Sequence, residues 1–137
     1  MTPEVQAFAT GFPLTLLHAG VTLCFLIVGV AVYVLLTPHK EIRLAREGNA
    51  AAALALGAVM VGLAIPLAVS MASSITLIEI GVWGVATTAV QLLVLRLTDF
   101  VLPGLPQRIA AGEVSAAVLL AAAKLSAALV LAAAVAG

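Results

Sequence analysis

Two titratable residues of this chain lie inside segments that are apolar enough to cross a membrane. His18 belongs to the segment LLHAGV (16–21), and Glu79 belongs to the similar segment LIEIGV (77–82). An ionisable side chain within a bilayer is costly, so it marks a functional site by default. Histidine titrates near physiological pH, and a carboxylate can take up a proton or a cation. The two residues therefore predict a site for a proton or a small ion.

Three further residues are expected at a similar depth and complete this candidate intramembrane polar site. Lys124 lies ten residues into the last apolar segment, and Pro66 lies within the second. A helical proline leaves the carbonyl four residues earlier, here that of Gly62, without its usual donor. The alternative is structural: Glu79 and Lys124 form a buried ion pair, and His18 donates to a backbone carbonyl. The sequence leaves both interpretations open.

Other polar residues gather in the third apolar segment and at its end. Arg96 and Asp99 are three residues apart, so they share a helix face and are expected to form an interfacial pair at the membrane boundary. Thr87, Thr88 and Gln91 form a polar strip deeper in the same segment. Hydrogen bonds between helices are the expected role of this strip.

The composition is that of a membrane protein. Of 137 residues 64% are hydrophobic and 9% are charged, with a net charge of zero, whereas soluble domains carry about a quarter charged residues. The neutral charge offers no basic surface for nucleic acid. The single cysteine, Cys24, supports neither a disulfide nor a thiolate metal site and is interpreted as a packing residue. Because no catalytic motif is present, we expect no enzyme, no cofactor and no metal.

Four segments are long enough to span a bilayer as helices, which takes roughly 20 apolar residues each. Their expected bounds are 12–36, 49–72, 75–97 and 114–136. Runs rich in alanine without alternation argue against transmembrane strands. The predicted fold is a single all-α integral membrane domain, residues 1–137, with four transmembrane helices.

The basic residues predict the orientation of these helices. Five of the six Lys and Arg residues flank the connections between the first and second and between the third and fourth segments: Lys40, Arg43, Arg46, Arg96 and Arg108. The positive-inside rule places these connections in the cytoplasm and both termini outside. Tyr33, near the inner end of the first segment, fits an aromatic belt at the interface.

The similarity between the segments around His18 and Glu79 indicates an internal repeat, 12–72 and 75–136. Each half is expected to form a helical hairpin, and the two parallel hairpins are related by an axis along the membrane normal. Small residues four apart, such as Gly20 and Cys24 or Ala58 and Gly62, allow helices to approach closely. Because these close-packing faces exceed what one bundle needs, a homo-oligomer is expected, with a dimer favoured, in contact with the lipid bilayer.

Several short motifs occur in order along the chain and carry a resemblance that covers nearly all of it: TPHKE (37–41), EGNAAA (47–52), GLAIPL (62–67), WG (83–84) and Gln91. With these motifs the chain resembles the YjfL-like family, domain of unknown function 350. The resemblance implies a small bacterial inner-membrane protein with four helices, and it implies no activity.

The leading hypothesis from the sequence is a small oligomeric protein of the bacterial plasma membrane that moves or senses a proton or a small ion. The alternative is a scaffold or anchor that transports nothing and docks a cytoplasmic or envelope partner. In that case the buried polar groups only specify how the helices pack.

Overall fold

A computed structural model describes residues 2–37 and 41–137 as a bundle of helices, and no strand occurs within these two ranges. In chain order the helices are α1 (Pro3–Leu36), α2 (Glu41–Arg46), α3 (Ala50–Ser73), α4 (Leu77–Val101), α5 (Leu105–Ala110) and α6 (Val114–Ala136). The long helices α1, α3, α4 and α6 are each long and apolar enough to cross a membrane. The prediction of an all-α membrane fold is confirmed.

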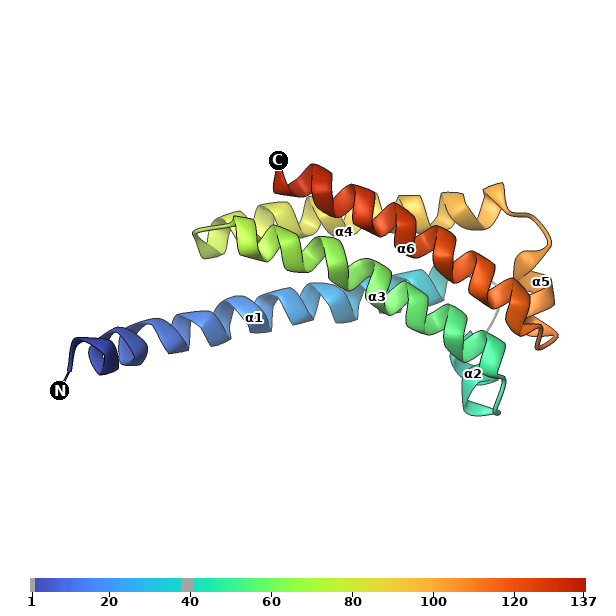
Figure 1. The fold of residues 1–137 in the computed structure, drawn as a ribbon, viewed down its shortest axis with the longest axis horizontal. Helices are drawn as coiled ribbons and strands as arrows, with labels where there is room; N and C mark the ends of the chain where they lie inside the picture. The colour runs from blue at the N-terminus through green and yellow to red at the C-terminus, as the bar shows by residue number, and fades with distance from the viewer. Residues whose placement is uncertain (1, 38–40) are drawn as a thin grey trace.

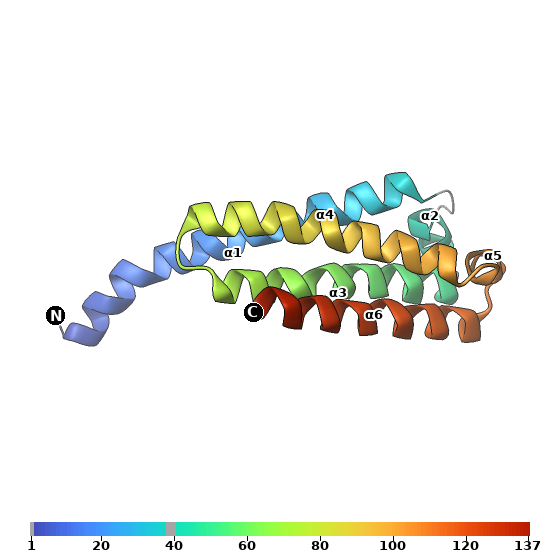
Figure 2. The same ribbon diagram turned by 90° about the horizontal axis from the view of Figure 1, so that it is seen from above.

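The four long helices run side by side, and the two ends of the bundle differ (Figures 1 and 2). The N-terminus, the C-terminus and the turn between α3 and α4 lie at one end, which we call the termini end. The short helices α2 and α5 lie at the other, which we call the α2/α5 end. The two hairpins, α1–α3 and α4–α6, therefore run in the same direction.

The helix bounds agree with the expected spans except at two ends. α1 begins at Pro3, not at residue 12, because the Thr2 side chain accepts a hydrogen bond from the Val5 amide and a proline occupies the first turn. Residues 2–17 are exposed, and this part of α1 extends past the rest of the bundle (Figure 1). α4 continues to Val101 because proline does not follow until Pro103. Asp99 therefore lies within a helix.

The loops of the two hairpins have the same local structure. Each short helix is followed by a glycine with positive φ, 93° at Gly48 and 94° at Gly112, which only glycine adopts at low cost. In both loops this glycine's amide donates to the carbonyl three residues earlier, and the next amide donates to the carbonyl five residues earlier. The likeness fits the expected repeat, whose origin in a duplication stays a prediction.

Alanine forms most of the contact between α3 and α6. One core cluster near the α2/α5 end combines alanines of these two helices with Leu105 and Ile109 of α5. The Asn49 side chain caps α3 by accepting from the Ala52 amide, and it also donates to the carbonyls of Ile109 and Ala110. One residue thus fixes the start of α3 to the end of α5.

α1 and α4 approach closely at Gly84, which leads to a first prediction. A Cβ atom at this position would lie 2.6 Å from a ring carbon of Phe25, whereas one at Gly81 would meet nothing within 4 Å. We expect Gly84→Ala to lower the free energy of unfolding by about 1–3 kcal/mol, as overpacked cores do. Gly81→Ala is the matched control and should change little. Thermal unfolding in detergent measures both, and equal stability of the two variants would contradict the close packing.

Candidate functional site

Three side chains from three helices meet inside the bundle near the α2/α5 end. The Lys124 Nζ atom of α6 lies 2.9 Å from Asp99 Oδ1 of α4 and also donates to the hydroxyl of Tyr33 on α1. The Tyr33 hydroxyl in turn donates to Asp99 Oδ2 at 2.6 Å. Lys124 is 1% exposed and Tyr33 is fully buried. These residues form a closed polar cluster, which we call the Lys124 cluster.

The direction of the helices explains why these residues meet. Side chains on a helix lean toward its N-terminus. α6 begins at the α2/α5 end, so the Lys124 side chain leans toward that end, whereas α1 and α4 begin at the termini end, so Tyr33 and Asp99 lean back into the bundle. Lys124 starts deeper than Tyr33 and Asp99, and their polar atoms converge at one level.

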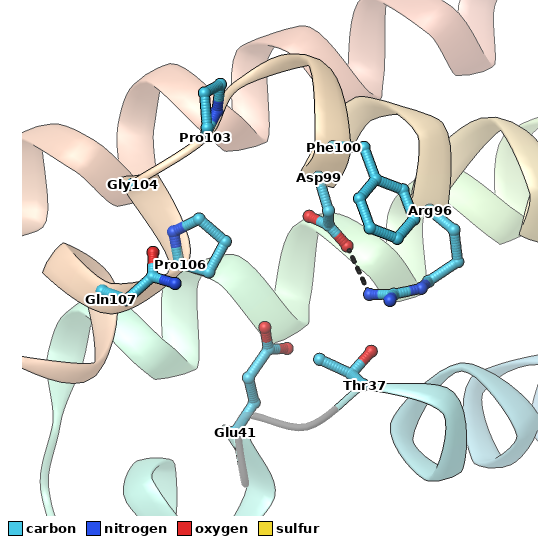
Figure 3. Close-up of a pocket in the computed structure, with 9 residues that line it drawn as sticks. All are labelled: Thr37, Glu41, Arg96, Asp99, Phe100, Pro103, Gly104, Pro106 and Gln107. Carbon is cyan, nitrogen blue, oxygen red and sulfur yellow. Dashed lines mark hydrogen bonds and ion pairs between the residues drawn. The ribbon is translucent and has the colours of Figure 1, made fainter.

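Beside this cluster is a cavity of about 270 Å³ that opens at the α2/α5 end. Figure 3 shows the side chains that line it: Thr37, Glu41, Arg96, Asp99, Phe100, Pro103, Gly104, Pro106 and Gln107. Arg96 Nη1 lies 3.3 Å from Asp99 Oδ2 and forms the expected ion pair. Asp99 is more than an interfacial residue, however, because it also binds Lys124 and Tyr33.

Glu41 faces the cavity from the first residue of α2. Its side chain points toward Asp99 across the cavity (Figure 3) and is 93% buried, since 7% is exposed. Within residues 2–37 and 41–137, its Oε2 atom has no hydrogen-bond partner. Glu41 is therefore a buried acidic group of this site with one oxygen atom unbonded among the described residues.

Opposing effects act on the Glu41 carboxyl. Burial raises its pKa above the usual value, and the charge of Asp99 adds to this rise. The cations Lys124 and Arg96 lower the pKa but do not cancel the effect of burial. A carboxyl whose pKa is raised by burial is a candidate for a functional group.

The structure separates the residues of the predicted intramembrane site. Glu79 lies 20 residues before Asp99 on α4, or about 30 Å at 1.5 Å per residue. His18 lies 15 residues before Tyr33 on α1, or about 22 Å away. The structural alternative, a pair between Glu79 and Lys124, does not form either, because Lys124 leans away from the termini end and binds Asp99.

Glu79 instead stabilises the start of α4. Its carboxylate accepts from the Ile75 amide at 3.0 Å, and its own amide donates to the Thr76 hydroxyl at 3.2 Å. A threonine followed three residues later by a glutamate is the pattern of a helix N-terminal capping box. This pattern was present in the sequence and accounts for Glu79 without any ligand. His18 is half-buried on α1.

A second polar contact forms at the Gly62 carbonyl, which Pro66 deprives of its usual helical donor. From the sequence this carbonyl was assigned to the intramembrane polar site, but in the structure it is bonded within the bundle. The Gln91 side-chain amide of α4 donates to the Gly62 carbonyl at 2.8 Å. Gln91 is fully buried. The predicted interhelical hydrogen bond from the polar strip is confirmed for this residue, and it joins α3 to α4.

This contact gives a second prediction, in the form of a double-mutant cycle. Gln91→Leu leaves the Gly62 carbonyl unpaired and should lower the free energy of unfolding by about 1–2 kcal/mol. In a Pro66→Ala background the new amide at position 66 can bond to Gly62, so Gln91→Leu should cost about 1 kcal/mol less. Denaturant unfolding in detergent measures all four variants. Additive effects would show that proline and glutamine do not act on the same carbonyl.

Two residues of the site were not identified from the sequence. Tyr33 was assigned to an aromatic belt, but it is buried and bonded to Asp99. Glu41 belongs to the motif TPHKE, for which the sequence predicts no site role, whereas the structure makes it the first residue of α2 with its side chain buried. Its neighbours His39 and Lys40 lie outside the described residues. For the pairing of Asp99 with Lys124, the available signals in the sequence were an acid at the end of the third apolar segment and a lysine within the fourth.

Comparisons with known proteins agree on a family. The family described as Domain of Unknown Function (DUF350) matches residues 7–135. The chain is 28% identical over 94 residues to the UPF0719 inner membrane protein YjfL of Escherichia coli K12, covering 69% of this chain and 71% of that protein. The same values hold for YjfL of Escherichia coli O157:H7. No solved structure matches significantly.

Proposed function

The chain belongs to the DUF350 family and is a multi-pass protein of the inner membrane, and from this starting point we propose that it moves protons across that membrane. The observation that carries the proposal is the Lys124 cluster beside a cavity into which Glu41 points. Lys124, Asp99, Arg96 and Tyr33 are linked to one another by hydrogen bonds. Glu41 faces them with an oxygen atom that has no hydrogen-bond partner among residues 2–37 and 41–137.

Glu41 is the proton acceptor in this proposal. The charge of the bound proton acts on the residues of the Lys124 cluster. With Glu41 ionised, the charges of Glu41, Asp99, Arg96 and Lys124 sum to zero; with Glu41 protonated, the sum is +1. A change in the charge of a buried group alters the interactions of all charges around it, because screening by water is weak there. Proton uptake at Glu41 removes one of the two carboxylate charges that attract the Lys124 ammonium, so the ammonium is held less tightly and can move more easily.

The orientation follows from the basic residues at one end of the bundle. Arg43, Arg46, Arg96 and Arg108 lie at or near the α2/α5 end. The positive-inside rule then places this end, the cavity and Glu41 at the cytoplasm, with both termini outside. We retain the homo-oligomer, with a dimer favoured, as a further proposal, since Gly20 and Cys24 stay exposed on α1.

A test of the proposal is proton flux into proteoliposomes that contain a pH-sensitive dye and carry an imposed membrane potential. We expect proton flux above that of empty vesicles for the wild type. For Glu41→Gln we expect flux to fall to the level of empty vesicles, because a side-chain amide does not take up a proton near neutral pH. Glu47→Gln is the matched control on the same loop, since Glu47 forms an exposed pair with Arg43. Equal flux for the two variants would remove Glu41 from the route.

The alternative function is a scaffold that transports nothing. It is favoured by the direct pairing of Lys124 with Asp99 and of Gln91 with Gly62, since each of these contacts also specifies helix packing. The two functions differ in what happens when the buried charges are replaced together by uncharged residues. A scaffold keeps its function under that change, whereas proton movement is lost.

A further inference from the structure

A second set of buried polar groups lies on the termini side of the Lys124 cluster. Thr87 and Gln91 are one turn apart on α4 and so share one face. Thr87 is 2% exposed and Gln91 is fully buried; Ser70 of α3, 3% exposed, lies nearer the termini end. In the part of the chain that the structure describes, Ser70 Oγ, Thr87 Oγ1 and Gln91 Oε1 lack hydrogen-bond partners. We call these three residues the polar line.

Buried polar atoms without a protein partner are expected to bind water. A buried polar atom without a partner costs about 1–3 kcal/mol. Native proteins satisfy such atoms with bound water where a cavity gives room for it. Three such oxygen atoms on two facing helices form a row of hydrogen-bonding sites for water rather than a single defect.

Cavities at the termini end supply the room. One of about 190 Å³ is lined by Ser70, Ser73, Ser74 and Trp83 together with the end of α6. A second, of about 230 Å³, shares Trp83 with the first and is lined by apolar side chains except at Thr87. Since one water takes about 30 Å³, the first cavity, with its three serines, has room for several, and the second offers water a polar partner at Thr87.

We propose that water enters the bundle from the termini end beside Ser70 and extends along Thr87 to Gln91, forming the second half of the proton's route. Its role in transport rests on the proposed function. Beyond Gln91 the fully buried side chains of Leu63 and Leu95 close the path toward the cavity at the α2/α5 end.

Lys124 spans this apolar barrier. A Cβ atom on Gly62 would lie 4.0 Å from the backbone carbonyl of Lys124, so the lysine backbone is at the level where Gln91 binds Gly62. Its ammonium nevertheless lies 2.9 Å from Asp99. The side chain therefore connects the end of the polar line to the Lys124 cluster.

The test is the reactivity of single cysteines in the full-length protein in proteoliposomes, in a Cys24→Ser background. The reagent is a membrane-impermeant, positively charged methanethiosulfonate added at the termini side. A thiol must ionise to react, which requires water. We expect Thr87→Cys and Ser70→Cys to react at least on the order of tenfold faster than Val85→Cys. Val85 is the matched control because it lies two residues from Thr87 with 61% of its side chain exposed, toward lipid.

The outcomes separate this inference from the proposed function. Reaction of Thr87→Cys no faster than that of Val85→Cys, or reaction only from the α2/α5 side, overturns the water path. If Thr87→Cys fails to fold, Ser70→Cys decides in the same way. Fast reaction in a protein that shows no proton flux supports the water path and contradicts the proposed function. Proton flux without fast reaction of the cysteines supports the proposed function and contradicts the water path.

Discussion

Asp99→Asn is expected to lower the free energy of unfolding by about 3–5 kcal/mol, because it leaves the Lys124 ammonium buried without a carboxylate. Lys124 is 1% exposed, so its ammonium depends mainly on partners within the protein. Lys124→Met should cost less, about 1–3 kcal/mol, since Asp99 keeps its bonds to Arg96 and Tyr33. The asymmetry between the two variants is specific to this arrangement, in which the acid has three donors.

The double variant Asp99→Asn with Lys124→Met removes both buried charges and should recover most of the stability that Asp99→Asn loses. Unfolding of purified protein in detergent, followed by circular dichroism, measures the series. Glu113→Gln is the control, because its pair with Arg108 is about half exposed and should contribute less than about 1 kcal/mol. If Asp99→Asn proved no more harmful than Glu113→Gln, the buried pair would not hold the bundle together.

The second large effect is a dependence of α2 docking on pH. Burial raises the Glu41 pKa, so the docked helix holds a proton more tightly than the undocked helix. Docking is therefore strongest below the ordinary pKa of 4.5 and weakens as pH rises toward the raised value. Each unit of pKa shift changes the docking equilibrium by about tenfold.

This dependence belongs to Glu41 only if other groups near it do not titrate in its place. The groups near it are Asp99 and Arg96 of α4, Lys124 of α6, Tyr33 of α1, and the uncharged Thr37 and Gln107. A nitroxide attached at Ala45→Cys of α2, in a Cys24→Ser background, reports docking as reduced mobility. We expect mobility to increase with pH in this protein and to be independent of pH once Glu41→Gln is added. An unchanged pH profile in the Glu41→Gln protein would assign the effect to another group.

The sequence was sufficient for the architecture because composition and helix signals determine it. Four apolar runs of the right length, with Asn49 as a helix cap and prolines near helix ends, led to the spans that the structure shows. The interhelical hydrogen bond of Gln91 was also predicted correctly, but its partner, the Gly62 carbonyl that Pro66 frees, was not. These inferences need only local chemistry.

The site was harder to predict because it depends on direction and on tertiary contacts. Depth along a helix suggested that Lys124 could meet Glu79. However, a side chain on a helix leans toward the start of its own helix. That direction carries the Lys124 ammonium to Asp99. Glu41 enters the site only because α2 packs against the α2/α5 end of the bundle. A helix of six residues is too short for its sequence pattern to show how it will pack.

Proton flux through the double variant Asp99→Asn with Lys124→Met tests the central claim most directly, because that variant is expected to fold while lacking the buried Lys124–Asp99 ion pair. In vesicles with an imposed potential we predict flux above the empty-vesicle level for the wild type and none above it for the double variant. Flux in the double variant equal to that of the wild type, or wild-type flux no greater than that of empty vesicles, would contradict a role of the Lys124 cluster in moving protons.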